Sequence, residues 1–348
     1  MKRQIILPAI LLISTLFPSC FKEIDTVPMS PSVEESFTVQ NSIREVQSFY
    51  RFYKTAVEEV ATASKNSWDL AFESDGEGSR VLLGWATNST TAPSGKFDFA
   101  EITQDLILDK INDTALVWGF DDPTFVTIMD SLVLTNHWED GEVYIQNRGL
   151  SKDTYYVIQY VSSTADSYTF RYASAQQLDQ VHEATVNRAP GMNYVYYSYE
   201  THRTVTVEPL STTWDLLCTP YRGWWETDDP GVYSPFNMSG IMINNENGVR
   251  IVRIFDPEIS FGEIDSTYID LYANEFTDLK GAIGANWKLL GAVGSTDLYT
   301  MDPDKKYLMK KYDDMTGQEM YFKLQIIDYK LDGQDHYPTI EFKYLGTE

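Results

Sequence analysis

The chain is poor in cysteine, histidine and basic residues, and each shortage excludes a class of chemistry. Two cysteines occur among 348 residues, so the fold cannot depend on a framework of disulfide bonds. Four histidines leave few candidates for metal ligands or for acid-base catalysis. The 27 basic residues face 51 acidic ones, and the net charge of −24 argues against nucleic-acid or anionic-lipid binding by the folded part.

The motifs of common enzyme classes are also missing. The sequence contains no Walker loop, glycine-rich dinucleotide fingerprint, His-Glu-x-x-His helix, EF-hand loop or nucleophile elbow. The scattered histidines nominate no serine nucleophile. Chance carboxylate pairs are so numerous that a glycosidase pair can be neither selected nor dismissed. We therefore expect a protein that is not an enzyme, with a glycosidase-like activity as a distant third hypothesis.

The first residues have the layout of an export signal. After a basic start, an apolar run extends from 5 to 17, which is too short to span a bilayer comfortably and is typical of a secretory signal. Cys20 follows a small residue after this run, which is the acceptor pattern of a bacterial lipoprotein. We expect a signal peptide at 1–19, a lipid on Cys20 and a flexible tether at 20–36. An ordinary cleaved signal with an incidental cysteine is the alternative.

The residues after Cys20 predict where the protein is located. Lys22 and Glu23 resemble the tag that sends some lipoproteins to the outer face of the outer membrane. We expect a surface-exposed protein that touches the membrane only through its lipid anchor. Cys218 would then be the one remaining thiol, and its position on the same strand face as Trp214 favours a buried structural residue over a reactive one.

Alternating polar and apolar residues predict strands in most of the chain. In the run from Tyr194 to Arg222, valines and threonines alternate before Trp214-Asp215-Leu216. A weaker copy of this run leads into Trp68-Asp69-Leu70. The two tryptophans stand 146 positions apart (214 − 68) in matching contexts, and this pattern is typical of a tandem duplication.

The length of the chain supports two domains. A single core usually stops growing at about 250–300 residues, and the chain beyond the expected signal is longer than that. Helical periodicity is scarce, whereas Thr, Val, Tyr and Phe are frequent between turn residues. We expect an all-β fold with few short helices, made of two tandem, mostly antiparallel, sandwich-like domains at 37–185 and 186–348.

The order of these motifs resembles the HmuY family of haem-binding surface lipoproteins. The resemblance is carried by Val195–Val207, Thr213–Arg222, Ser239–Asn247 and Met320–Leu345, and the first half shows the same order more faintly. It implies two HmuY-like β domains that capture haem or a similar tetrapyrrole between two axial His or Met side chains. It also implies hand-over to a TonB-dependent outer-membrane transporter.

The resemblance further suggests axial ligands. In the family, one axial histidine stands seven residues before the tyrosine of a late strand, and His137 keeps this spacing to Tyr144. In the second half the slot holds Thr300, with Met301 beside it. In the first half Met129 is a candidate for the other axial ligand. We expect haem as the possible cofactor and no metal beyond its iron.

A second candidate site is the segment from Tyr221 to Trp225. Adjacent tryptophans on an extended strand point to opposite sides, so at least one of Trp224 and Trp225 is exposed, packed on a neighbouring part or offered to a ligand. With Tyr221, they would stack on a porphyrin or a sugar ring while Arg222 pairs a carboxylate. Trp85 takes a comparable place in the first half. The alternative is a lid over one end of a sandwich.

Two hypotheses about function follow. The first is capture of haem or a similar tetrapyrrole at the cell surface for transport. The second is a partner- or glycan-binding module that kept the HmuY-like fold and lost the iron ligands.

Overall fold

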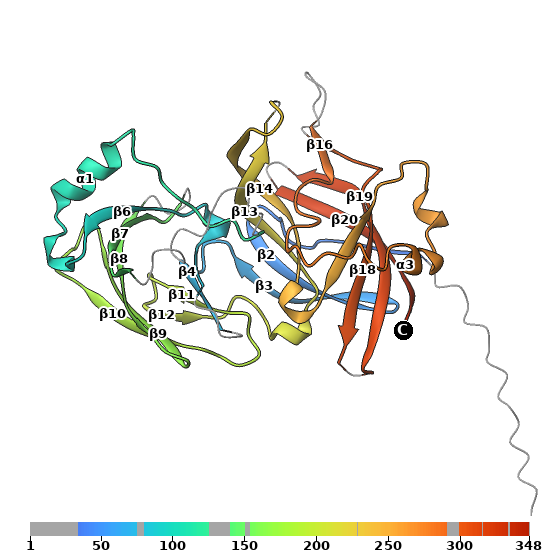
Figure 1. The fold of residues 1–348 in the computed structure, drawn as a ribbon, viewed down its shortest axis with the longest axis horizontal. Helices are drawn as coiled ribbons and strands as arrows, with labels where there is room; N and C mark the ends of the chain where they lie inside the picture. Colours follow the sequence, from blue (N-terminus) through green and yellow to red (C-terminus); the bar gives the residue numbers. More distant parts are fainter. Residues whose placement is uncertain are drawn as a thin grey trace, which may run out of the picture. The chain divides into compact units, whose positions relative to one another are not determined.

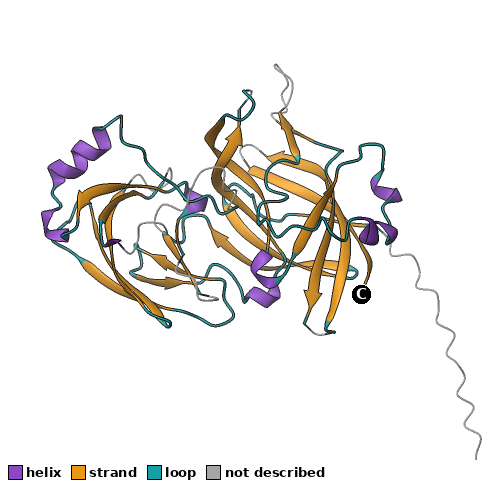
Figure 2. Ribbon diagram, in the orientation of Figure 1, coloured by secondary structure: helices purple, strands orange, loops and turns teal. Residues whose placement is uncertain are grey.

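The computed structural model describes residues 34–74, 80–124, 140–149, 154–227, 229–290, 299–314, 316–332 and 335–347, all within one compact unit. Strands dominate these residues and helices are few, as Figures 1 and 2 show, which confirms the prediction of an all-β fold. Among the described residues, no helix has the length and apolar character needed to cross a membrane. The expected signal peptide and Cys20 lie outside these residues, and the first strand already begins within the expected tether.

The structure has a regular series of strands with short helical turns between them. The strands are β1 (Glu35–Thr38), β2 (Val46–Tyr53), β3 (Ala56–Ser64), β4 (Leu70–Glu73), β5 (Val81–Leu83), β6 (Thr90–Lys96), β7 (Val143–Asn147), β8 (Tyr155–Ser163), β9 (Ser167–Ser174), β10 (His182–Asn187), β11 (Tyr194–Ser198), β12 (Arg203–Val205), β13 (Leu216–Glu226), β14 (Tyr233–Ile243), β15 (Arg250–Ile254), β16 (Lys288–Leu290), β17 (Tyr299–Met301), β18 (Lys306–Asp313), β19 (Gln318–Asp332) and β20 (Asp335–Thr347). The described helices are α1 (Gln104–Asn112) and α3 (Thr267–Leu271), with 3-10 turns η1 (Trp85–Thr87), η2 (Phe99–Glu101), η4 (Ser211–Thr213), η5 (Asn245–Asn247) and η6 (Phe261–Glu263).

The strands form two pairs of antiparallel sheets with matching strand order. Sheet A runs β1-β20-β19-β18-β15 and sheet D runs β10-β9-β8-β7-β6. Sheet B runs β3-β2-β13-β14 and sheet C runs β12-β11-β4-β5. In the second pair β10 to β12 take the positions that β1 to β3 take in the first, although β1 to β3 come before the other strands of their pair in the chain and β10 to β12 come after theirs. Strands β16 and β17 form a separate two-stranded sheet.

Three hydrophobic cores place the sheets in layers. Sheets A and B enclose one core around Phe52 and Trp287, and sheets C and D enclose another around Phe72 and Tyr172. The other faces of sheets B and C meet on a third core, which contains Trp68 and is rich in aromatic rings. Side chains from η2 and α1 cover the outer face of sheet D, and those from η6 and α3 cover that of sheet A.

Strands from both predicted domains share each sandwich. The A–B sandwich takes β1 to β3 from the start of the chain and β13 to β20 from its end, so that blue and yellow strands adjoin in Figure 1. The C–D sandwich consists of β4 to β12. Residue 185 lies inside β10, within one sheet. The arrangement therefore differs from two consecutive domains at 37–185 and 186–348, because each body of strands receives a three-strand segment from the other half.

Asp69 joins β4 to β11, which belongs to the three-strand segment β10–β12 of the C–D sandwich. Its backbone N–H donates to the carbonyl of Tyr197 at 2.8 Å, and its carboxylate accepts from the backbone N–H of Tyr199 at 2.8 Å. Arg148 donates to the same carboxylate from Nε at 2.7 Å and from Nη2 at 3.0 Å. The buried aspartate thus joins β4 to the segment that follows β10.

Asp215 does the same in the A–B sandwich. Its backbone N–H donates to the carbonyl of Tyr50 at 2.7 Å, and its carboxylate accepts from the backbone N–H of Phe52 at 2.7 Å. Lys311 donates to this carboxylate at 2.5 Å and to the carbonyl of Phe52 at 3.0 Å. The two Trp-Asp-Leu segments therefore have equivalent surroundings, as a duplication requires, while the duplication itself stays a prediction.

The connection from β12 to η4 contains a buried acid, Glu208. Its carboxylate accepts from the backbone N–H of Asn193 at 2.7 Å and from the hydroxyl of Tyr196 at 2.9 Å. Burial raises the pKa of Glu208 to about 7, although the nearby Lys280 ammonium and these hydrogen bonds act in the opposite direction. The carboxyl is therefore protonated in the folded protein at a pH where an unfolded glutamate is ionised.

This shift makes stability depend on pH. An unfolded glutamate titrates near pH ~4.3, so the contribution of Glu208 is fully present below that pH and is lost as the pH rises through about 7. We expect Glu208→Gln to remove a fall of about 2–4 kcal/mol in unfolding free energy across this window. Urea unfolding of both proteins at about pH 5 and about pH 8 measures it. An equal pH dependence in the two proteins would contradict the assignment.

Candidate functional site

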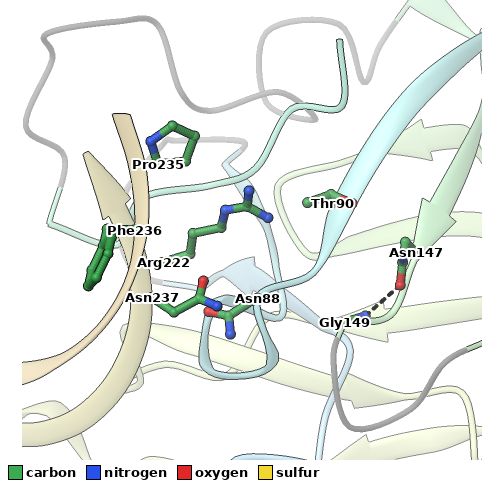
Figure 3. A pocket seen from close by; sticks show the side chains of 8 residues that line it. All are labelled: Asn88, Thr90, Asn147, Gly149, Arg222, Pro235, Phe236 and Asn237. Atoms are coloured by element: carbon green, nitrogen blue, oxygen red, sulfur yellow. Dashed lines mark hydrogen bonds between the residues drawn. The ribbon is translucent and has the colours of Figure 1, made fainter. Parts of the chain in front are cut away.

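A cavity of about 490 Å³ lies between strands β13 and β14 and the β6–β7 side of sheet D (Figure 3). Its wall combines polar side chains with apolar surface. The lining residues are Asn88, Thr90, Asn147, Gly149, Arg222, Pro235, Phe236 and Asn237. Because four of them come from the C–D sandwich and four from sheet B, the site requires both sandwiches.

The length of β13 and β14 explains how sheet B reaches the cavity. Only Leu216–Cys218 of β13 pairs with β2, whereas β13 pairs with β14 along its whole length. The outer part of the hairpin is therefore a two-stranded ribbon. Arg222 and Asn237 lie directly opposite each other on this ribbon. Figure 3 shows the Phe236 ring on the other side of the strand from the Arg222 guanidinium, as strand alternation requires.

The central charge of the cavity is the guanidinium of Arg222. It lies over the ring of Phe120, 4.8 Å from the ring centroid. Among the described residues no side chain forms an ion pair or hydrogen bond with it, and its Nε is buried without a partner. Burial lowers the pKa of Arg222 from its ordinary value, and no nearby charge contributes to the shift. The site thus has a partly desolvated cation facing the cavity.

Side-chain amides surround this cation. Asn88 ends η1 in the left-handed conformation at φ 62°, and neither Asn88 nor Asn237 has a side-chain partner among the described residues. Figure 3 shows these amides beside each other near Arg222. Asn147 is held by the backbone N–H of Gly149 at 2.9 Å. The cavity therefore offers donors and acceptors suited to hydroxyl or anionic groups.

Gly149 lines the cavity at a point where the backbone passes too close to Thr87 for a side chain. Its φ is +101°, and a Cβ at this position would lie 1.9 Å from the carbonyl oxygen of Thr87. We expect Gly149→Ala to lower the free energy of unfolding by about 2–4 kcal/mol and to displace Asn147. Gly95→Ala is the matched control, because its φ is +79° and nothing lies within 4 Å of the added Cβ. Urea unfolding should show a loss of only about 1–2 kcal/mol there, and equal losses would contradict the clash.

The predicted stacking residues have different surroundings. Trp224 is half-buried, and its ring packs on Phe120 with centroids 5.1 Å apart. Trp225 is also half-buried and follows on the opposite side of the ribbon, while Tyr221 is 3% exposed. Trp85 is 2% exposed, and its ring lies 4.5 Å from that of Trp68 in the third core, so it offers no face to a ligand. Of this set, Arg222 lines the cavity.

The predicted axial ligands do not form a site in the described part of the chain. His137 and Met129 lie outside the described residues. Met301 is half-buried on β17 and packs against the core of the A–B sandwich. In the described ranges, no three His, Cys, Asp or Glu side chains gather as a metal site would require.

Two histidines that are distant in the sequence meet at the edge of the C–D sandwich. The rings of His182 and His202 stack with centroids 4.1 Å apart and planes tilted by 24°. The Nδ1 of His202 lies 2.7 Å from the hydroxyl of Tyr172. Because the rings meet face to face, they are not oriented like two axial ligands that point their nitrogens at one iron.

Comparison of the chain with known protein families, curated proteins and solved structures finds no match. The resemblance seen in the sequence therefore stays a prediction, and the cavity carries the functional argument. Sequence reasoning missed Asn88, Asn147 and Asn237. Asparagines at strand ends and turns are ordinary turn residues, so the sequence contained no signal that marks them as a site.

Proposed function

We propose that the protein is a non-catalytic, lipid-anchored binding protein of the outer membrane surface that captures a glycan in the Arg222 cavity. The observation that carries the proposal is the set of polar groups at its wall that have no side-chain partner among the described residues. They are the half-buried guanidinium of Arg222, the half-buried amide of Asn88 and the exposed amide of Asn237. A volume of about 490 Å³ lies in the range of small-ligand sites, which is roughly 300–1,000 Å³.

The chemistry of the wall supports binding over cleavage. Amide and guanidinium groups form directional hydrogen bonds with sugar hydroxyls, and they neither donate nor remove protons readily at neutral pH. Among the described lining residues there is no carboxylate, imidazole, thiol or amine. General acid-base or nucleophilic catalysis would need such groups.

The proposal is tested by screening the purified mature protein against immobilised glycans, followed by calorimetry on the bound class. We expect Asn88→Ala and Asn237→Ala each to weaken binding about tenfold, because each variant removes the hydrogen bonds of one amide. Asn187→Ala is the matched control, since Asn187 is exposed on β10 and does not line the cavity. Absence of binding to every glycan class would overturn the proposal.

Capture of haem or a similar tetrapyrrole, with hand-over to a TonB-dependent transporter, is the second candidate. The resemblance to the HmuY family and the spacing of His137 to Tyr144 support it. Titration of the mature protein with haem, followed by its Soret band, tests this function directly. We expect His137→Ala and Met301→Ala each to change the spectrum if these residues ligate the iron. An unchanged Soret band on titration of the unmodified protein would exclude haem capture.

A further inference from the structure

The acidic chain compensates most of its buried cations with acidic side chains. This pattern is expected at a net charge of −24. Ion pairs join Arg80 to Glu73 and Glu246, Arg148 to Asp69, Lys311 to Asp215 and Lys323 to Glu34. Arg222 has no such partner among the described residues, although acidic side chains are nearly twice as common as basic ones in the sequence.

Packing restricts the direction in which Arg222 can find a partner. One face of its guanidinium is covered by the Phe120 ring, and its Nε is shielded from solvent. The nearby lining residues Asn88, Asn237 and Thr90 are neutral. The carboxylate of Asp122, on the segment that follows Phe120, accepts hydrogen bonds from Thr124 and from the backbone N–H of Trp224 instead. A partly desolvated cation without a counter-charge is unfavourable in the empty site, and an anion that enters the cavity removes this penalty.

The geometry also indicates which anion fits. A guanidinium is planar and presents its N–H groups in one plane, and a carboxylate matches this plane with two parallel hydrogen bonds. The neighbouring amides then remain available to the hydroxyl groups of the same ligand. None of the described lining residues is acidic, so the wall itself does not repel an anion.

We propose that the ligand is an acidic saccharide whose carboxylate binds Arg222, as in a glycan that contains uronic acid. The inference rests on the proposed glycan-binding function and names the chemical class of its ligand. A sulfate ester shares the oxyanion chemistry and can also accept two hydrogen bonds from one guanidinium, but it is a weaker base than a carboxylate and accepts weaker hydrogen bonds.

Calorimetry on the full mature protein tests the proposal with three probes of similar length: galacturonic acid oligomers, sulfated galactose oligomers and neutral galactose oligomers. We expect galacturonic acid oligomers to bind at least about tenfold more tightly than neutral ones, with sulfated oligomers between them. The preference for acidic oligomers should fall as salt is added. Tightest binding of the sulfated oligomers would overturn the carboxylate assignment.

Arg222→Met provides the decisive variant, because it keeps an unbranched apolar stem like that of arginine and removes the charged guanidinium. We expect it to abolish the preference for acidic oligomers without lowering the melting temperature, since Arg222 forms no ion pair in the described structure. Arg253→Met is the matched control. Arg253 also lies over an aromatic ring, Phe255, at 4.7 Å and also has an unpartnered Nε, but it does not line the cavity. This control should leave the preference unchanged.

The outcomes separate the two levels of the argument. Equal binding of neutral and galacturonic acid oligomers would overturn the carboxylate anchor and leave glycan binding intact. If Arg222→Met still binds galacturonic acid oligomers more tightly than neutral ones, Arg222 is not the residue that binds the carboxylate. Absence of binding to all three probes and to the wider glycan screen would overturn both this inference and the proposed function.

Discussion

Asp215→Ala is expected to lower the free energy of unfolding by about 3–5 kcal/mol. The substitution leaves the Lys311 ammonium without its counter-charge, and the side chains of both partners are only 4% exposed. It also removes the acceptor of the Phe52 backbone N–H, which joins β2 to the start of β13. Urea unfolding followed by circular dichroism gives the loss directly.

Two controls separate the buried charge from other effects. Asp215→Ala combined with Lys311→Met should recover much of the loss, because the second change removes the unpaired charge. Glu101→Ala breaks an exposed pair with Lys96, whose side chains are 39% (Lys96) and 52% (Glu101) exposed, and should cost less than about 1 kcal/mol. A loss below about 1 kcal/mol for Asp215→Ala would show that this pair does not hold the strands together.

Separate chains of residues 34–185 and 186–348 are not expected to fold alone. The second chain lacks β1 to β3, and with them the Tyr50 and Phe52 side chains that lie in the core of the A–B sandwich. Its strand β13 would lose the pairing with β2. Far-UV circular dichroism and thermal unfolding should show no cooperative transition for either chain, and mixing the two should restore one.

A third chain provides the matched control for the division of the protein after residue 185. Residues 66–208 contain β4 to β12, which are all the strands of the C–D sandwich. We expect this chain to unfold cooperatively, at a lower temperature than the whole protein because its face of the third core is exposed. Cooperative unfolding of 186–348 alone would contradict the view that the exchanged strands complete the A–B sandwich.

Sequence reasoning predicted the local structure well because local structure depends on local patterns. Period-two alternation predicted the all-β fold, and the repeated Trp-Asp-Leu motif marked two segments with equivalent hydrogen bonds at Asp69 and Asp215. The expectation that Cys218 is buried is confirmed. The prediction that Trp224 and Trp225 point to opposite sides follows from strand geometry alone.

The sequence by itself thus determined which residues form strands and which faces of those strands are apolar. Only the tertiary structure decided which strands pair, because β2 and β11 are both aromatic-rich, mostly buried strands and either would suit β4 or β13 by local preference. The cavity depends on this pairing of strands, since the pairing brings Arg222 of β13 near Asn88, which ends η1. Contacts between residues more than a hundred positions apart are set by the packing of sheets on shared cores, and periodicity along the chain contains no information about them.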